Sequence, residues 1–260
     1  MAHTILKTKD LSIGYRRKGS DLLIAENIEV EINAGELTAV IGVNGVGKST
    51  FLRSISGIQE NLKGDVLIEN QILETLSPEK KAASISLVLT EQPISKNLSV
   101  FELIALGRQP YTNWLGSLSR NDLREIKNAI DLVNVRALSE KKCYELSDGQ
   151  LQKVLIARAL AQNTSLIILD EPTTHLDIYH QAFVLKLLKE LTRKTSKSIV
   201  FATHELNLAL QLCDKILLMK EGKVISGTPE ELFRNGTFKS LFPDDLIIFD
   251  EDLRSFKIKT

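Results

Sequence analysis

Residues 42–50 read GVNGVGKST and fit the pattern G-x-x-x-x-G-K-[ST]. The stretch follows the apolar run AGELTAVIG, typical of a buried strand, and opens a helical pattern at about Ser49 to Ser56. Glycines there allow successive backbone N–H groups to close around phosphate oxygens. Lys48 would supply a positive charge for the β- and γ-phosphates, and the Ser49 hydroxyl would bind Mg²⁺. The sequence therefore predicts a nucleotide site with these members: Gly42, Asn44, Gly45, Gly47, Lys48 and Ser49.

Two further apolar runs end in polar side chains. LIILDEP, residues 166–172, places Asp170 at the carboxyl edge of a buried strand, where parallel sheets bind ligands. Asp170 suits a place in the Mg²⁺ shell, and Glu171 is then placed to polarise an attacking water. SIVFATH ends at His204, whose ring can face the same edge and hold the γ-phosphate or the water. The three motifs together predict hydrolysis of the bound nucleotide.

The first half of the chain changes from strands to helices. Most of the first 90 residues have strand patterns, including AENIEVEI, residues 25–32, as one half-buried strand. From about residue 90 to 145 the pattern is helical. SVFELIALG has a capping box at Ser99 and Glu102 and is expected to close at Gly107. NDLREIKNAIDLV carries apolar residues at helical spacing, so this stretch is predicted to be a helical insertion.

After Gly149, apolar strands alternate with helices again. Such alternation predicts a parallel sheet covered on both faces, which is an α/β fold. KILLMKEGKVISGT is predicted to be a hairpin with Glu221 and Gly222 in its turn. TPEEL starts a helix capped by Thr228. The last fifteen or so residues are expected to form a mixed tail.

The composition is that of an ordinary globular protein. The chain has 260 residues, and its 33 basic residues balance 33 acidic ones, so no global charge points to nucleic acid or an anionic membrane surface. Cys143 and Cys213 are the only cysteines and are expected to be buried or inert thiols in a reducing compartment. The N-terminus has no apolar signal segment, and no run approaches the roughly 18 apolar residues of a spanning helix.

The order of these motifs resembles that of an ABC-type ATPase subunit. The phosphate loop is followed by the helical insertion, LSDGQ at 146–150, LIILDEP, THLD at 174–177 and ATH at 202–204. The resemblance implies a P-loop NTPase with one domain over residues 1–260. A RecA-like core would be formed by about 1–90 and 150–260. A helical subdomain would span about 91–149, and an antiparallel β subdomain would lie near the N-terminus.

The turn LSDGQ takes its meaning from this resemblance, since Ser and Asp also cap ordinary helices. In the family, an LSGGQ-like turn caps the γ-phosphate of ATP bound by a second subunit, so that two copies enclose two ATP molecules. Ser147, Gly149 and Gln150 match that pattern, whereas Asp148 replaces its first glycine. A Ser hydroxyl, a Gly and a helix N-terminus together suit an anion.

The resemblance implies further roles. Tyr15, at the end of the first strand, would stack on adenine, Thr50 would join the phosphate contacts, and Asp177 would couple the sites of the two subunits. The family has a Gln at the end of the strand where this chain reads SLVLTEQP. Thr90 occupies that position and could ligate Mg²⁺ through its hydroxyl. Alternatively, Gln92 could reach back from two residues further on.

The stretch NLSVFELIALGRQPYTNWLG is similar to importer ATPases that serve iron–siderophore, haem and cobalamin uptake. This resemblance implies a peripheral protein at the cytoplasmic face of the cell membrane, partnered by a polytopic permease and, indirectly, by a substrate-binding protein. The permease would dock on the helical insertion. Arg108 with the aromatic residues Tyr111 and Trp114 is expected to be exposed there, as at an interface.

Two other classes of protein share some of these motifs. A soluble ABC ATPase, such as an iron–sulfur cluster assembly ATPase, would share every nucleotide motif. DNA-repair and translation-associated types usually carry two cassettes or long insertions, and the neutral charge argues against a nucleic-acid partner. A small-molecule kinase could share the phosphate loop, but it leaves LSDGQ ahead of LIILDEP unexplained.

Overall fold

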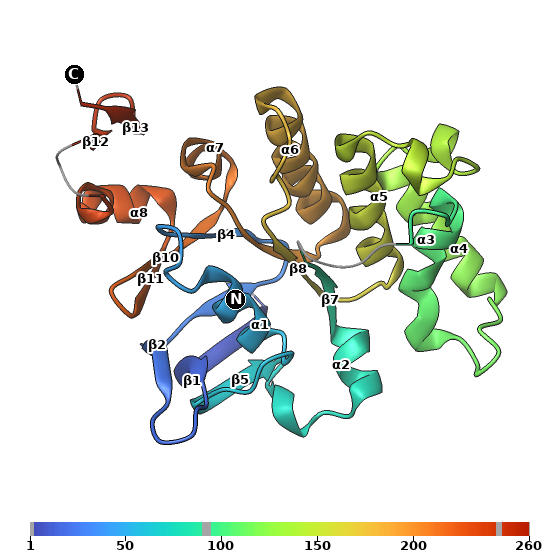
Figure 1. The fold of residues 1–260 in the computed structure, drawn as a ribbon, viewed down its shortest axis with the longest axis horizontal. Coiled ribbons are helices and arrows are strands. Elements are labelled where there is room, and N and C mark those ends of the chain that lie inside the picture. The colour runs from blue at the N-terminus through green and yellow to red at the C-terminus, as the bar shows by residue number, and fades with distance from the viewer. Residues whose placement is uncertain (1–2, 90–94, 243–245, 260) are drawn as a thin grey trace.

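A six-stranded sheet carries all three nucleotide motifs (Figure 1). The computed structural model describes residues 3–89, 95–242 and 246–259. The strand order is β11-β10-β4-β9-β8-β7, and all neighbours are parallel except the antiparallel pair β10 and β11. The bounds are β4 Leu37–Ile41, β7 Ile85–Val88, β8 Leu166–Asp170, β9 Ser198–Ala202, β10 Lys215–Lys220 and β11 Lys223–Gly227.

The register of this sheet places the three motif loops at one edge. β9 lies between β4 and β8, and Ala202 of β9 pairs with both Val40 of β4 and Asp170 of β8. The loops that follow these three strands therefore leave the sheet at the same level. This is the carboxyl edge at which parallel sheets bind ligands.

A second, antiparallel sheet covers one side of the first. Its order is β2-β1-β5-β6, and β3 also pairs with β1. The bounds are β1 Thr4–Tyr15, β2 Leu22–Ile28, β3 Glu31–Asn33, β5 Lys63–Ile68 and β6 Gln71–Ile72. The single strand expected at residues 25–32 is therefore wrong. The buried Thr8 hydroxyl occupies the break, since it donates to the Ile28 carbonyl at 2.7 Å and accepts from the Val30 N–H at 2.9 Å.

Helices surround the central sheet. The α-helices are α1 Lys48–Ile55, α2 Pro78–Ser84, α3 Val100–Ala105, α4 Arg120–Leu132, α5 Asp148–Ala161, α6 Ile178–Thr195, α7 Leu206–Leu212 and α8 Pro229–Arg234. The 3₁₀ helices are η1 Leu73–Thr75, η2 Leu106–Tyr111, η3 Arg136–Leu138, η4 Cys143–Glu145 and η5 Thr237–Ser240. The strand patterns of the first 90 residues gave no sign of α2. Its N-terminus nevertheless carries a helix-start signal, Ser77 as cap and Pro78 at the first position.

Helices α3, α4 and α5 pack on one another at one end of the molecule (Figure 1, green to yellow). The capping box at Ser99 and Glu102 is present, as predicted. Gly107 does not end the helix, because the chain continues through it as η2. Gly107 instead allows a close approach, since a Cβ there would lie 2.2 Å from the Arg158 carbonyl oxygen of α5.

Two hydrophobic clusters hold these layers together. One joins the central sheet to α3, α4, α5 and α6, and the other joins its opposite face to α1 and the antiparallel sheet. Phe51 and Phe201 are fully buried, one in each cluster. Cys143 and Cys213 are both buried and free, as expected. Burial raises the pKa of both thiols. Within the described residues, no helix is long and apolar enough to span a membrane.

The last residues form a hairpin, so the expectation of a mixed tail is wrong. Strand β12, Ile247–Asp250, pairs with β13, Ser255–Ile258. Their phenylalanines pack with those of α8, η5 and the following residues in a cluster whose members are Phe233, Phe238, Phe242, Phe249 and Phe256. Asn207 of α7 also exchanges two hydrogen bonds with the Phe256 backbone. These long-range contacts stabilise the hairpin, and no local sequence pattern predicts them.

Candidate active site

The loop after β4 turns into α1 through Gly47. Gly47 is the N-cap of α1 with φ of 109°, a conformation that L side chains rarely adopt. A Cβ at Gly47 would also lie 2.2 Å from Cγ2 of Ile24. Helix α1 therefore begins at Lys48, with its N-terminal N–H groups directed toward the loop. Such an N-terminus favours phosphate.

A cavity of about 400 Å³ opens at this N-terminus. The residues that line it are Asn44, Gly45, Gly47, Lys48, Ser49, Thr50, Glu171 and His204. The Lys48 ammonium is buried and donates to the carbonyls of Gly42 at 3.1 Å and Val43 at 3.4 Å. Burial lowers the pKa of Lys48, and the nearby Glu171 and Asp170 carboxylates oppose that shift. The cavity thus combines a held cation with backbone donors, which suits a polyphosphate.

Asp170 lies beside this cavity. The Ser49 hydroxyl donates to Asp170 Oδ1 at 3.0 Å, which connects α1 to the end of β8. Burial raises the pKa of Asp170 most, while the bond from Ser49 lowers it and the charge of Glu171 raises it further. No group of three His, Cys, Asp or Glu side chains converges on a metal within the described part of the chain. A carboxylate and a hydroxyl fit Mg²⁺, which takes most of its other ligands from phosphate and water.

Glu171 and His204 face each other across the cavity mouth. The His204 Nε2 lies 2.6 Å from Glu171 Oε1, and the Thr174 hydroxyl donates to Glu171 Oε2 at 3.1 Å. Glu171 has φ of 50°, a left-handed conformation that costs a non-glycine residue on the order of 1–3 kcal/mol. The fold therefore holds this carboxylate in a strained turn, with both oxygens fixed.

Tyr15 contacts the helix that follows the phosphate loop. Its hydroxyl lies 3.1 Å from the Thr50 hydroxyl, so β1 of the antiparallel sheet is connected to α1. The side chain remains partly exposed. An aromatic ring beside the phosphate loop can stack on a nucleobase.

Four residues that the resemblance assigns to the site shared by two subunits do not line this cavity, namely Ser147, Gly149, Gln150 and Asp177. Ser147 is the N-cap of α5 and forms a capping box with Gln150, with distances of 3.2 and 3.3 Å. Ser147 is exposed, whereas Gly149 is buried. Asp177 is exposed and caps α6 through the His180 N–H. These residues do not contact the nucleotide site of their own chain.

The sequence profile of the family described as ABC transporter matches residues 25–174. The chain belongs to the ABC transporter family. It is an ATP-binding domain of that family, and it hydrolyses ATP. An AAA domain profile also matches residues 140–210, a segment that includes Asp170 and Glu171. The order of motifs along the chain is thus that of an ABC ATPase.

Individual relatives cover nearly all of this ABC ATPase. An uncharacterized ABC transporter ATP-binding protein of Methanocaldococcus jannaschii is 38% identical over 98% of this chain and 87% of its own. The petrobactin import ATP-binding protein FpuD of Bacillus anthracis is 35% identical over 91% of this chain and 86% of its own.

Solved structures agree on the fold of the ABC ATPase. CbiO1 from Clostridium perfringens, part of the ABC transporter complex cbiONQ, has a TM-score of 0.78 and 31% identity over 90% of this chain and 92% of its own. A dimeric ATP-binding cassette in a post-hydrolysis state, bound to ADP and Pi, has a TM-score of 0.74 and 27% identity over 86% and 99%. The predicted P-loop NTPase fold of ABC type is therefore confirmed.

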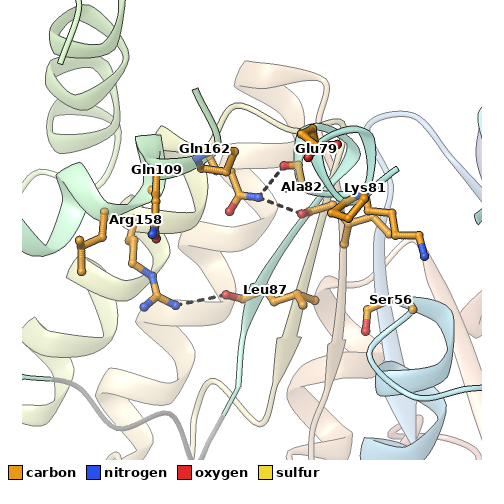
Figure 2. Close-up of a pocket in the computed structure, with 14 residues that line it drawn as sticks. Ser56, Glu79, Lys81, Ala82, Leu87, Gln109, Arg158 and Gln162 are labelled. Atoms are coloured by element: carbon orange, nitrogen blue, oxygen red, sulfur yellow. Dashed lines mark hydrogen bonds between the residues drawn. The ribbon is translucent and has the colours of Figure 1, made fainter. Parts of the chain in front are cut away.

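The ABC ATPase also has a groove away from the nucleotide cavity. It has a volume of about 730 Å³ and lies between α2 and β7 on one side and η2 and α5 on the other (Figure 2). In α5, Arg158 donates to the Leu87 carbonyl at 3.3 Å. Gln162, directly after α5, donates to the carbonyls of Ala82 at 2.7 Å and Ile85 at 3.0 Å. These bonds attach α5 to the wall of the groove.

The region beside the groove corrects one expectation. Arg108 is not exposed, because only 3% of its side chain is accessible and it bonds Asp122 at 2.8 Å and the Ala161 carbonyl at 2.7 Å. Trp114 is 91% exposed and Tyr111 is partly exposed. The aromatic residues of this stretch are therefore at the surface, while its arginine fastens η2 to α4 and α5.

Sequence reasoning missed Thr174 and His180. Thr174 fixes Glu171, and its signal is its place three residues later in a tight turn. His180 bonds Asp177, and its signal is the third helical position after a capping Asp. Thr90 and Gln92, the alternatives for the Mg²⁺ shell, lie outside the described residues.

Proposed function

We propose that this ABC ATPase is the energising subunit of an importer that takes up an iron–siderophore, haem or cobalamin-type compound through a membrane permease. The likeness to the petrobactin import protein FpuD, which extends over most of the chain, supports an import role. In this role the chain is a peripheral protein at the cytoplasmic face of the cell membrane. A substrate-binding protein would act with the permease on the other side.

At the nucleotide site, each side chain has a chemical task. Tyr15 stacks on adenine, and Lys48, the loop N–H groups and Thr50 hold the phosphates. Ser49 and Asp170 would hold Mg²⁺, which would neutralise charge on the phosphate oxygens when bound. Glu171 accepts a hydrogen bond from the attacking water and polarises it. His204 orients Glu171, to which it is already bonded at 2.6 Å.

The turn at Ser147, Gly149 and Gln150 serves ATP bound by a second copy. Support comes from its position, because Ser147 is exposed and the turn does not line the cavity of its own chain. The related cassette with ADP and Pi is dimeric. The Ser147 capping box leaves the hydroxyl hydrogen available, so it can donate to a phosphate oxygen. Asp177 couples the two sites.

The chain acts as one domain, with a core of 1–90 and 150–260 and a helical subdomain of about 91–149.

The observation that carries the coupling to a permease is the groove of Figure 2. Helix α1 starts at the phosphate loop with Lys48, and Ser56 and Gly57 at its other end line the groove. Helix α5 starts at the Ser147 turn, and Arg158 near its other end also lines the groove. A permease segment in the groove would thus contact the far ends of both helices that present donors to ATP. Because each helix is rigid, a displacement of its end at the groove would also displace its end at the nucleotide, and the reverse.

A mild-detergent pull-down from native membranes tests this proposal. The tagged chain should recover a polytopic membrane protein in equal amount. Leu106 lines the groove and is 48% exposed, so Leu106→Glu should abolish the recovery while ATP binding remains. Leu253 is 72% exposed on the C-terminal hairpin, so Leu253→Glu is the matched control and should leave recovery intact. Recovery of the wild-type chain only from the soluble fraction, with assembly proteins, would contradict an importer role.

A further inference from the structure

The ring of His180 lies directly against the backbone of Gly149. A Cβ added to Gly149 would meet Cδ2 of His180 at 2.8 Å, and the next nearest atoms, at 3.5 and 3.6 Å, belong to the same ring. Gly149 is in the first turn of α5, and its φ is not in the left-handed region. Backbone conformation therefore does not require glycine here. Glycine is needed at this position because the His180 ring leaves no room for a Cβ.

The ring of His180 is held in place from its other edge. Nδ1 lies 2.9 Å from both carboxylate oxygens of Asp177, and the His180 N–H donates to Asp177 Oδ1 at 2.9 Å. These bonds lower the pKa of Asp177, with the backbone bond as the larger cause. The ring cannot rotate away from Gly149 without leaving the carboxylate. The His180 side chain therefore joins Asp177, the N-cap of α6, to the Ser147 turn at the start of α5.

A second contact between the same helices lies one turn further on. The Lys153 ammonium of α5 lies 4.1 Å from the centre of the Phe183 ring of α6. Lys153 and Phe183 follow Gly149 and His180 by four and three residues, which is one helical turn in each case. The start of α6 is therefore attached to the start of α5 at two successive levels.

The chain that precedes Asp177 leads back to Glu171. The Thr174 hydroxyl and N–H both donate to Glu171, at 3.1 and 3.2 Å, the second to its carbonyl. Asp177 follows three residues later and caps α6. Hydrogen bonds join Glu171 to Thr174 and Asp177 to His180, and the short stretch of chain between Thr174 and Asp177 connects the two pairs. The His180 ring then extends this connection to Gly149.

We propose that His180 is a positioning residue that fixes the Ser147 turn relative to Asp177 and Glu171 of the same chain. This inference rests on the proposed function, in which the turn caps ATP of the second copy while Glu171 acts on ATP of its own chain. His180 then couples the two ATP sites, because it links the turn that contacts one ATP to the residue that acts on the other. The Ser147 capping box forms within α5 alone, so the helix does not need His180 to begin. What His180 adds is the connection between the two turns.

A double-mutant cycle on Gly149 and His180 tests the contact itself. Gly149→Ala should lower ATP hydrolysis, because its methyl group displaces the ring from Asp177. His180→Ala should also lower it, because the connection is lost. In the His180→Ala background, however, Gly149→Ala meets no ring, and alanine suits a helix better than glycine. The second substitution should then cost less than it does in the wild-type background, by about fivefold or more in rate.

Two further variants separate the two edges of the ring. His180→Asn keeps a donor for Asp177 and loses the contact with Gly149, whereas His180→Phe keeps a ring and loses the donor. Each should raise the half-saturating ATP concentration by about fivefold and lower the Hill coefficient of hydrolysis toward one. ATP binding by the separate chain and the unfolding midpoint should not change. His3→Asn, at an exposed histidine that does not line the nucleotide cavity, is the control.

Several outcomes would overturn the inference. Equal losses from Gly149→Ala in both backgrounds would show that the glycine is needed for another reason. Wild-type Hill coefficients in His180→Asn and His180→Phe would show that the ring carries no coupling. Both results would leave the importer role intact, since the wild-type chain would still bind its permease. If the wild-type chain formed no ATP-dependent dimer, the proposed two-copy site would fail, and this inference with it.

Discussion

Nε2 of His204 lies 2.6 Å from Oε1 of Glu171, although the two residues are 33 positions apart in the chain. The sheet brings them together, because β8 and β9 are neighbours and Asp170 pairs with Ala202. Thr174 holds the other Glu171 oxygen at 3.1 Å. A carboxylate fixed at both oxygens loses little entropy when it aligns a water molecule, and the remaining lone pairs can accept that water's hydrogen.

Glu171→Gln should bind ATP as the wild type does but turn it over very slowly. The amide keeps the size and the contacts, but it is a poor base, and loss of a general base costs about 10²–10⁴-fold. Phosphate release measures turnover, and equilibrium binding measures affinity. Glu140→Gln, an exposed site, should match the wild type and serves as control. Normal hydrolysis by Glu171→Gln would remove Glu171 as the base.

His204→Ala should lower turnover by about 10²-fold, because a donor to the catalytic carboxylate is lost. His204→Gln, which can present an amide N–H to Glu171, should recover part of that loss. If His204 acts through Glu171, adding His204→Ala to Glu171→Gln should cost less than about threefold more. Steady-state rates of the two single variants and the double variant decide this. Fully multiplicative losses would mean that the imidazole acts on the phosphate by itself.

The sequence was a good guide wherever function depends on a local pattern. Gly47, Lys48 and Ser49 are contiguous, and their loop can be placed from flanking periodicity alone. Asp170 and His204 could be placed at one sheet edge because each ends an apolar strand. The register that puts His204 on Glu171 was not predictable, since it depends on β9 lying between β4 and β8.

Contacts made by tertiary packing explain the errors. The burial of Arg108 depends on Asp122 and on the Ala161 carbonyl, which α4 and α5 supply. Gly107 resembles a helix stop, but it is needed because α5 passes close to it. The C-terminal hairpin packs through phenylalanines that come from several separate segments and follow no periodic pattern in the sequence. Long-range contacts of this kind override local propensity.

Thr90→Ala should raise the Mg²⁺ concentration needed for half-maximal hydrolysis if the Thr90 hydroxyl is a metal ligand. Hard oxygen ligands are what Mg²⁺ requires, and loss of one should weaken the shell by about 10-fold or more. Gln92→Ala is the paired variant, and it should leave the Mg²⁺ titration unchanged on this view. The reverse pattern would assign the metal contact to Gln92. Two unchanged titrations would exclude both residues from the metal shell.

Asp122→Asn should destabilise the protein far more than Asp131→Asn. Arg108 and Asp122 are both about 3% exposed, and loss of one charge leaves the other buried without compensation, which costs about 3–5 kcal/mol. Asp131 also pairs with an arginine, Arg136, but that pair is exposed and should contribute little. Urea unfolding of both variants gives the comparison. Equal destabilisation would contradict a structural role for the buried pair.

The same pair gives a pH dependence. Bonds from the Ser119 hydroxyl and N–H, together with Arg108, hold the pKa of Asp122 below its ordinary value of 3.8. Because the folded state favours the carboxylate, its contribution is fully present above the unfolded pKa and is lost as the pH falls through the folded pKa. The difference in unfolding free energy between wild type and Asp122→Asn should therefore be constant above about pH 5 and shrink below about pH 4. If this difference in unfolding free energy did not change down to pH 2, the destabilisation by Asp122→Asn would come from poor packing or hydrogen bonding of the amide and not from the lost charge.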